Sequence, residues 1–575
     1  MSAPTAPPAL RRLILRLFSR KYGLQLHASA ISFIVDTLDE HGLLEDEAVW
    51  QDSIEALAKG VVEDLGRGEG TSSIVTRTAL ERVYESLLVA DTAASATQIE
   101  RLQNDITSRD PLTYGEKADP HRFFHVVDSF KMPKVVFDER RKVFEKTSQA
   151  PKLLPPATSK PAYLLERLNI VKSAVLRNEN FLPPLAVGSG KDRDAFMKLT
   201  STTNLLGRQG QRFLLFGLLC TTSDGRYALE DADGVVGLDL EDTIPGEGIF
   251  TEGSMVLVEG EFTQEERIHV FAIGHPPSEP RKQARLLCNQ VDFLGTGSMS
   301  LKEESAMKIH EESHSDLAFV FISDLHLDHP KTLSSFRSML QGYLDADFIP
   351  FAFVLCGSFL ENSKTGKGDV ISRYQDAFSN LGDVLSAFPS IIAASHFVFV
   401  PSPSDPFSSP TLPRSALSSA ISSKLFARLN RPSLASVKVE DHIHFTSNPA
   451  RLRYFGQDIV VFREDLMGKM LRNTIRLKEE AREVDLKKYL VSTILDQAHL
   501  CPLPQQARPV LWDYDHTLRL YPMPTALVLA DTFDRFELTY EGCHVFNPSR
   551  FKGNHFGWTT YYPASGKAER SELPH

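Results

Sequence analysis

Apolar residues near the N-terminus recur with the period of a helix. In two successive segments they follow the i, i+3, i+4, i+7 spacing that places one face of a helix in a core. These positions are Leu10, Leu13, Ile14 and Leu17, followed by Ile31, Ile34, Val35 and Leu38. The second segment ends at His41-Gly42, and glycine commonly terminates a helix. The pattern predicts a small helical domain over residues 1–92.

The period changes to two between about Gly210 and His275. Residues alternate there between apolar and polar, as they do in strands with one buried face. The expected strands are Arg212–Leu219, Arg226–Glu230, Val235–Leu240, Met255–Phe262 and Ile268–Ile273. Five strands in so short a segment are typical of a small barrel of the OB type, which we place at residues 201–284.

Barrels of this type often bind single-stranded nucleic acid through aromatic side chains in a basic groove. This segment offers Phe213, Phe216 and Tyr227. Its strands and loops also carry the acidic residues Glu230, Asp231, Asp233, Asp239, Glu241 and Asp242. We therefore expect a barrel that docks on protein and keeps its aromatic residues in its core.

Residues 93–200 combine the composition of a linker with some ordered features. The small residues from Thr92 to Ala96 and a later proline-rich part indicate linker. The segment from Phe123 to Phe144 carries too many aromatic residues for a free linker, so we expect it to dock on a neighbouring domain. A helix is expected from Tyr163 to Arg177.

Residues 285–575 alternate apolar strands with helical stretches such as Lys331–Leu344 and Asp369–Phe388. That alternation predicts an α/β layered domain. Met299–His314 is rich in Glu, Ser and Lys, which predicts a disordered insertion. The predicted fold class is therefore multidomain α+β, with an N-terminal helical domain, an OB-type β-barrel and a large α/β sandwich domain.

Composition narrows the partners that this 575-residue chain can take. Its formal net charge of -11 argues against coating duplex DNA by phosphate neutralisation alone, and it suits protein partners. The five cysteines are scattered without a C-x-x-C pair, so neither a disulfide framework nor a zinc module is expected. No apolar run is long enough to predict a membrane span.

The first 35 residues hold no acidic side chain, while basic residues such as Arg11 and Arg16 punctuate the apolar stripe. A mitochondrial transit peptide has the same composition. A second helical pattern follows at once, which favours a packed first helix over a targeting segment.

Candidate metal ligands follow the apolar run Leu317–Ile322. The run leads into Ser-Asp-Leu-His, which places Asp324 and His326 where a two-metal hydrolase holds its first carboxylate and imidazole. The next strand should end in Gly-Asp, with an aspartate that bridges both metals, but the residue there is Ser358. A neutral hydroxyl cannot hold two dications about 3.5–4 Å apart.

The third strand, Ile391–Val400, should deliver an asparagine ligand and a histidine. Pro403 and Ser404 stand in those positions, and only Asp405 keeps its type. Near the C-terminus, Asp531 begins the segment where a His-x-His pair should close the site. We therefore expect no catalytic residue, metal or cofactor. What remains is a vestigial pocket made of Asp324, His326, Ser358, Ser404 and Asp405.

One alternative metal site is left open by residues 441–444, Asp-His-Ile-His. In a strand, His442 and His444 would face the same side, as a metal pair does. Together with Asp324, His326 and Asp405 they would make a second kind of site, although no bridging carboxylate accompanies them. A solvated strand face explains the same pattern without a metal.

Several short motifs in the C-terminal half are specific as a set. They are Ile322-Ser323-Asp324, Phe397–Pro401 with Asp405-Pro406, Thr446–Arg451, Ile459–Leu466, Tyr521–Pro524, Thr539–Cys543 and Phe546–Phe551. With a barrel preceding them, the chain resembles the B-subunit family of the eukaryotic replicative DNA polymerases, and within it the epsilon branch. That family combines an OB fold with an inactivated calcineurin-like phosphoesterase domain.

The resemblance implies assembly rather than catalysis. It implies that the barrel and the phosphoesterase-like domain bind the C-terminal domain of the polymerase's catalytic subunit. The N-terminal domain resembles the lid domain of AAA+ ATPases and is expected to link the polymerase to the GINS part of the replicative helicase. DNA is then contacted mainly through the complex, in the nucleus. His326 departs from many family members, which have lost that ligand.

Two other functions are left open by the residues alone. One is the B subunit of polymerase delta or alpha, although the N-terminal helical domain and the Thr539–Cys543 run favour epsilon. The other is an active metal-dependent phosphoesterase, for which Asp324, His326 and residues 441–444 are the motivation.

Overall fold

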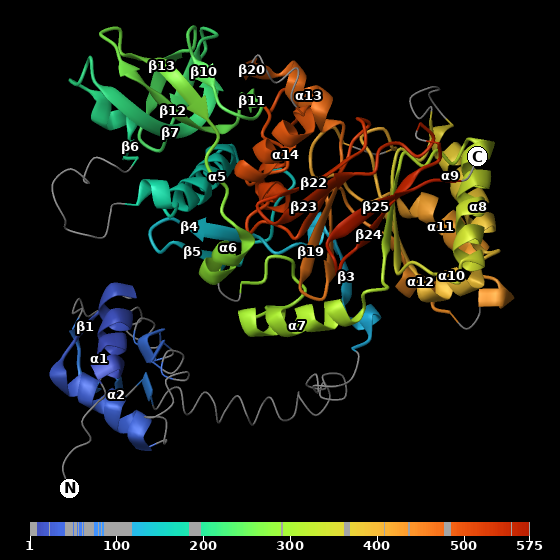
Figure 1. Ribbon diagram of the computed structural model, residues 1–575, viewed down its shortest axis with the longest axis horizontal. Coiled ribbons are helices and arrows are strands. Elements are labelled where there is room, and N and C mark those ends of the chain that lie inside the picture. The colour runs from blue at the N-terminus through green and yellow to red at the C-terminus, as the bar shows by residue number, and fades with distance from the viewer. Residues whose placement is uncertain are drawn as a thin grey trace. The chain divides into compact units, whose positions relative to one another are not determined.

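Figure 1 shows the fold of the chain, a computed structural model. The structure describes residues 8–21, 24–40, a discontinuous set between 50 and 84, and 118–573 apart from seven gaps. The gaps are 183–196, 289–290, 362–368, 407–408, 435–436, 477–484 and 554. The chain divides into two compact units, Met1–Glu116 and Lys117–His575, which are described separately.

The N-terminal unit has a core of its own. Helix α1 (Pro8–Leu15) continues as a π-helix (Arg16–Lys21), and α2 (Ala28–Glu40) follows. Two-residue strands β1 (Gln25–Leu26) and β2 (Ile74–Val75) pair in parallel, which the sequence did not predict. The buried side chains include Leu10, Ile14, Leu17, Ile34, Val35 and Leu38. These are positions of the two apolar stripes, so each predicted stripe does face a core.

The predicted barrel is present, with every predicted strand end within two residues of the observed one. Its strands are β7 (Arg212–Thr221), β8 (Tyr227–Glu230), β9 (Val235–Asp239), β12 (Met255–Phe262) and β13 (Arg267–Gly274). β12 pairs with β7 and β13, β8 pairs with β7 and β9, and β9 closes the barrel in parallel with β13. Gly260 marks a bulge, where a Cβ would lie 2.4 Å from the His269 carbonyl oxygen.

Two short strands and one helix complete the barrel. β6 (Leu199–Thr200) pairs with β7, and β10 (Ile244–Pro245) pairs with β13. Phe213 lies in the barrel core, and Phe216 packs against α5 (Ser159–Val175) on the outside. Of the three barrel aromatics considered from sequence, only Tyr227 is exposed, to 37%.

Two six-stranded sheets form the centre of the C-terminal unit (Figure 1). The first contains, in spatial order, β17 (Ile443–Phe445), β16 (His396–Val400), β15 (Ala352–Cys356), β14 (Phe319–Ser323), β24 (Trp558–Tyr562) and β25 (Lys567–Ser571). The second contains β22 (Phe536–Tyr540), β23 (Cys543–Asn547), β21 (Ala526–Ala530), β19 (Gln457–Arg463), β18 (Ala450–Tyr454) and β3 (Phe124–Asp128). The facing sides of the two sheets bury an apolar core.

Helices cover the outer face of each sheet. Those on the first sheet are α8 (Pro330–Asp345), α9 (Val370–Leu385), α10 (Pro389–Ala394) and α11 (Ser419–Leu429), with α12 (Val439–His442) leading into β17. Those on the second are α13 (Leu466–Arg472) and α14 (Leu486–Asp496). The layered α/β domain predicted from the alternating pattern is therefore a four-layer sandwich. Among the described residues, no helix is both long and apolar enough to cross a membrane.

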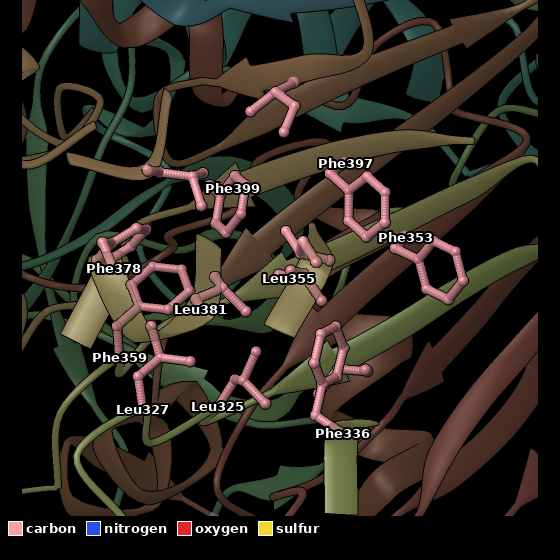
Figure 2. Close-up of a cluster of buried hydrophobic side chains, with 14 of the residues drawn as sticks. Leu325, Leu327, Phe336, Phe353, Leu355, Phe359, Phe378, Leu381, Phe397 and Phe399 are labelled. Atoms are coloured by element: carbon pink, nitrogen blue, oxygen red, sulfur yellow. The ribbon is translucent and has the colours of Figure 1, made fainter. Parts of the chain in front are cut away.

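Figure 2 shows the core between the first sheet and its helices, where the ring of Phe353 lies beside that of Phe397 and the ring of Phe378 beside that of Phe359. In β14, Val320 and Ile322 belong to this core, whereas the residues between and before them face the other sheet. Because both faces of the strand are buried, its sequence is a continuous apolar run.

The segment predicted to be a disordered insertion is a helix, α7 (Leu301–Ser313). Ser300 and Glu303 form a capping box at its start, which satisfies two backbone N–H groups that would otherwise lack partners. Near its other end, Glu311 accepts hydrogen bonds from Gly456 and Gln457 at 2.8 and 3.0 Å. The prediction was wrong because polar composition was weighed above the cap and because these distant partners are not visible in sequence.

Part of the segment 93–200 is built into the C-terminal unit. β3 pairs antiparallel with β18 and becomes the edge of the second sheet. β4 (Val135–Asp138) and β5 (Val143–Lys146) form a hairpin, and α6 (Arg281–Cys288) follows the barrel.

Buried polar contacts join the barrel to the sandwich. Gln497, directly after α14, accepts a hydrogen bond from the Met255 N–H at 2.6 Å and donates one to the Met255 carbonyl at 2.7 Å. A side-chain amide can replace a neighbouring strand in this way because it carries the same donor and acceptor as a peptide group. Nearby, β11 (Phe250–Thr251) pairs with β20 (Thr474–Arg476). The barrel and the sandwich are therefore parts of one unit.

We expect Gln497→Ala to loosen this junction. The substitution leaves the N–H and carbonyl of Met255 buried without partners, at a cost of about 1–3 kcal/mol. Amide hydrogen exchange at Met255 should accelerate by roughly tenfold or more. The matched variant Gln341→Ala removes a surface hydrogen bond to Asp345 and should leave Met255 unchanged. Unchanged exchange in Gln497→Ala would contradict this account of the junction.

Candidate functional site

Three loops meet where β14, β15 and β16 end. These strands are parallel neighbours, so their carboxyl ends share one edge of the sheet. Asp324 follows β14, Ser358 lies in the loop after β15, and Asp405 in the loop after β16. The Ser358 N–H donates to Asp324 Oδ1 at 2.8 Å, and the Phe359 N–H donates to Asp405 Oδ1 at 3.0 Å. The structure thus brings these three predicted residues together.

Arg463, the last residue of β19, reaches from the second sheet to balance the charge of Asp324. Its Nη2 donates to Asp324 Oδ1 at 2.8 Å, and its Nε donates to the Gly357 carbonyl at 2.7 Å. Its Nη1 donates to Asp465 Oδ1 at 2.9 Å. Asp324 and Arg463 each expose only 3% of their surface.

The surroundings hold Arg463 in its charged form. Burial disfavours the charge, but the carboxylates of Asp324 and Asp465 outweigh burial and raise the pKa of Arg463. A fixed guanidinium in contact with Asp324 repels a divalent cation and occupies the acceptor that a metal would need. Asp324 is therefore half of a buried ion pair in this structure.

Asp405 is also fully engaged. Its Oδ1 accepts a second hydrogen bond from the Tyr374 hydroxyl at 2.7 Å, and its Oδ2 accepts one from the Ser402 N–H at 2.7 Å. The side chain is 2% exposed, and burial raises its pKa. A Cβ at position 357 would lie 1.9 Å from Asp405 Oδ2, so the loop needs glycine there. Asp405 ties loops together instead of facing an open site.

The two remaining predicted residues add little polar contact. His326 is partly buried, burial lowers its pKa, and its Nδ1 has no hydrogen-bond partner in the described part of the chain. Ser404 donates through its backbone N–H to Ser402 Oγ at 3.1 Å. No group of three His, Cys, Asp or Glu among the described residues is arranged to hold a metal ion. The donor set therefore does not fit a two-metal centre.

Asp531, which begins the segment where a closing His-x-His pair was sought, caps a helix. Its Oδ2 accepts hydrogen bonds from the N–H groups of Leu466 and Met467, at 2.7 and 2.8 Å, where α13 begins. These are N–H groups that the helix itself cannot satisfy. The residue thus has a structural role.

The strand predicted at residues 441–444 begins only at Ile443, because His442 ends the short helix α12. The prediction that His442 and His444 share one strand face was therefore wrong. β17 pairs with β16 from Phe397↔Ile443 onward, so both histidines lie near the start of β16. Asp324 lies at the opposite edge, about 13 Å away along a five-residue strand. The alternative metal site does not form.

Four histidines gather at this opposite edge. His121 Nδ1 lies 2.9 Å from His396 Nε2, and His396 Nδ1 lies 3.1 Å from His444 Nε2. The rings of His396 and His442 stack with centroids 5.2 Å apart. Burial, reinforced by the neighbouring histidines, lowers the pKa of His396 to about 3 and that of His444 to about 4. No sequence pattern indicated this cluster, since 275 positions separate its first two members.

Two charged residues of the site were missed in the sequence, Arg463 and Glu464. Glu464 exposes 1% of its surface and pairs with Arg414 at 2.6 Å, and also with Arg508 and Lys469. Burial opposes its charge, but these three cations lower its pKa. One feature of the sequence could have identified both residues, the charged run that directly follows an apolar strand. Charges at the end of a buried strand must be paired.

Two sequence models of known families match the chain. One, described as the B subunit of DNA polymerase alpha/epsilon, matches residues 319–538. The other, described as the OB-fold domain of DNA polymerase epsilon subunit 2-like proteins, matches residues 157–277. The second match includes α5, which packs on the barrel.

Individual relatives cover most of the chain. It is 33% identical to the DNA polymerase epsilon B subunit of Schizosaccharomyces pombe, over 98% of this chain and 96% of that protein. It is 32% identical to DNA polymerase epsilon subunit 2 of Homo sapiens, over 99% of both chains. It is 30% identical to the DNA polymerase epsilon B subunit of Arabidopsis thaliana, over 78% of this chain and 82% of that protein.

Replacing Arg463 with methionine should destabilise the C-terminal unit by about 3–5 kcal/mol, because buried Asp324 then keeps only the longer contact with Arg550, at 3.4 Å. Adding Asp324→Asn to the same chain should restore at least half of the loss. Urea unfolding followed by circular dichroism measures both effects. The control is Arg428→Met, whose exposed pair with Asp383 should contribute less than about 1 kcal/mol. Additive losses in the double variant would contradict the pairing.

The histidine cluster should make stability fall in acid. Histidine in an unfolded chain titrates near about 6.5, whereas His396 and His444 stay neutral down to about 3 and 4. The unfolded state therefore binds more protons in this window, so stability is present above about pH 6.5 and is lost as pH falls toward 4. At about pH 5, each of these two histidines should lower the free energy of unfolding by roughly 2 kcal/mol relative to its value above about pH 6.5.

Unfolding free energy measured against pH tests this account. His396→Asn should flatten its slope between about pH 6.5 and 4.5. The control is His310→Asn, on α7 outside the cluster, which should keep the original slope. Equal slopes in both variants would show that the cluster does not carry the effect.

Proposed function

The chain belongs to the family of DNA polymerase epsilon B subunits, and we propose that it works in that polymerase as a scaffold without catalytic activity of its own. As a member of this family it is an accessory subunit of a replicative DNA polymerase. The observation that carries the proposal is the buried ion pair of Arg463 with Asp324. It places protein charge where a two-metal hydrolase needs a cation.

The rest of the pocket supports the same proposal. Ser358 stands where a bridging carboxylate is needed, and its hydroxyl donates to the Leu360 carbonyl at 2.8 Å. Asp405 accepts three hydrogen bonds, which leaves its carboxylate committed to the loops around it. We therefore propose that no residue of the pocket is catalytic and that it takes no cofactor.

The C-terminal domain of the catalytic subunit is proposed to bind mainly on the barrel side. Ten of the sixteen large apolar side chains exposed among the described residues lie between Leu153 and Ile244. Leu154 is 93% exposed, and Leu206 and Ile244 are each 70% exposed. By contrast, the described residues from 310 onward contribute only Ile371. Such concentrations of apolar surface mark protein interfaces, and stable subunit interfaces bury about 2,000 Å² or more. The phosphoesterase-like domain would extend this surface.

The N-terminal unit is proposed to reach the GINS part of the replicative helicase. Its own apolar core and its division from the rest at residues 116 and 117 support a separately acting module. The corresponding organisation is a helical domain over 1–92, a linker with a docking segment over 93–200, the barrel over 201–284 and the phosphoesterase-like domain over 285–575.

DNA contact is proposed to occur mainly through the complex. The formal net charge of -11 supports this division of labour, because phosphate binding by the chain alone would need a basic surface. The nucleus is the compartment that replication implies.

The two alternative functions, a B subunit of polymerase delta or alpha and an active phosphoesterase, have less support. Relatives from fungi, animals and plants that align with this chain are named for polymerase epsilon rather than delta or alpha. No arrangement among the described residues favours an active phosphoesterase.

Co-expression with the C-terminal domains of the epsilon, delta and alpha catalytic subunits tests the proposal. We expect a one-to-one complex with the epsilon domain alone by size-exclusion chromatography. Ile244→Asp should weaken that complex at least tenfold, about 1.4 kcal/mol, because it places a charge on the apolar barrel face. The matched Ile371→Asp changes an exposed side chain of α9 and should bind as the parent does.

Two outcomes would contradict the proposal. Absence of a complex with the epsilon domain would remove the scaffold role, and equal weakening by both substitutions would remove the barrel from the interface. A chain that lacks residues 1–92 should still bind the C-terminal domain of the epsilon catalytic subunit but should no longer bind GINS.

A further inference from the structure

A cavity of about 60 Å³ is lined by residues of α6, α7 and β18, and none of its lining residues belongs to the Asp324 pocket. About 10–15 Å³ of such volume holds one water, so there is room for a tetrahedral oxyanion. Its walls carry five arginines, which are Arg281 and Arg285 from α6, Arg451 and Arg453 from β18, and Arg519. Guanidinium groups match phosphate oxygens in charge and in shape.

Carboxylates in the wall balance only some of these arginines. Glu304 is shared by Arg281 at 3.3 Å and Arg285 at 3.0 Å. Asp458 pairs with Arg451 at 3.2 Å. Among the residues that line the cavity, Glu304 and Asp458 are the two carboxylates.

Arg453 and Arg519 add positive charge that the carboxylates in the cavity wall do not pair. Arg453 donates only to neutral acceptors in the described chain, Thr296 Oγ1 at 3.2 Å, Met299 Sδ at 3.4 Å and a backbone carbonyl. Arg519 pairs with Glu166, which lies outside the lining. With Asp292, whose charge also acts on Arg453, four carboxylates accompany five guanidinium groups, which leaves one positive charge in excess around a partly buried space.

Two donors in the wall also lack a partner among the described residues, the Nε atoms of Arg281 and Arg451. Arg451 is only 5% exposed. Burial lowers the pKa of Arg451, and the charge of Arg519 adds to this effect, which a bound anion would oppose.

We propose that this cavity binds a phosphate group, either as free orthophosphate or on a phosphorylated serine side chain. The negative charge of phosphate is attracted by the excess of arginine, and several forked donors can each bind two of its oxygens. A cation is excluded by the same charge, and a carboxylate carries half the charge of a phosphate. A bound phosphate would link α6 to β18.

Isothermal titration calorimetry of the full chain with orthophosphate tests the proposal, with sodium chloride added to keep ionic strength constant. We expect one saturable site per chain. Arg453→Gln and Arg281→Gln should each weaken binding at least tenfold. The matched control, Arg428→Gln, changes an exposed arginine of α11 and should bind phosphate as the parent does.

A loss of binding can be assigned to the cavity only if the variant is folded. Circular dichroism first establishes that each variant is folded. If Arg453→Gln is not, Arg453→Lys keeps the charge, loses the fork and should still weaken binding measurably. No saturable heat up to about 10 mM orthophosphate, well above a millimolar Kd, would overturn the proposal. Equal affinity in the parent and in the folded cavity variants would also overturn it.

A short phosphoserine peptide and its unphosphorylated form distinguish the two sources. Binding of the phosphopeptide at least as tightly as orthophosphate, lost in Arg281→Gln, would assign the cavity to a phosphorylated chain. Binding of orthophosphate alone would assign it to a small anion. Binding of neither would refute the site.

Discussion

The ion pair between Arg463 and Asp324 is the interaction on which the centre of this protein depends. It joins the two sheets, because Arg463 ends β19 and Asp324 follows β14. The same guanidinium also donates to the carbonyls of Gly357 and Ala530, at 2.7 and 3.2 Å. A buried charge without a partner is strongly destabilising. The ion pair therefore fixes the positions of the chain after β14 and at the end of β19.

This arrangement explains how charges of the protein itself hold the loops at this edge of the sheet. A two-metal centre holds its loops together through carboxylates that share cations. Here Arg463 supplies the cation from the protein, and backbone N–H groups and Tyr374 supply the donors for Asp405. The sandwich is thereby a rigid body to which the barrel is attached through Gln497. Ten of the exposed large apolar residues described in the C-terminal unit lie in the segment from Leu153 to Ile244, which includes part of the barrel.

Local patterns gave reliable predictions where the chain's own period decides the structure. The barrel strands and the buried run of β14 follow from alternation and from continuous hydrophobicity. Prediction failed at α7 and at His442, where a local cap was underweighted or where partners far along the chain contribute. Polar α7 is stabilised by its capping box and by Gly456 and Gln457, and His442 leaves the predicted strand for the turn of α12.

Residue type and spacing alone predicted the order of helical, barrel and sandwich regions and identified Ser358 as the residue where a two-metal hydrolase needs a carboxylate. The buried partner of Asp324 became visible only in the folded chain. Arg463 lies 139 positions from Asp324, and a charged residue at the end of an apolar strand has many possible partners. The arginine cavity has the same origin, since its charges come from segments that only folding brings together. Long-range electrostatic pairing depends on distance in space, and no local pattern encodes that distance.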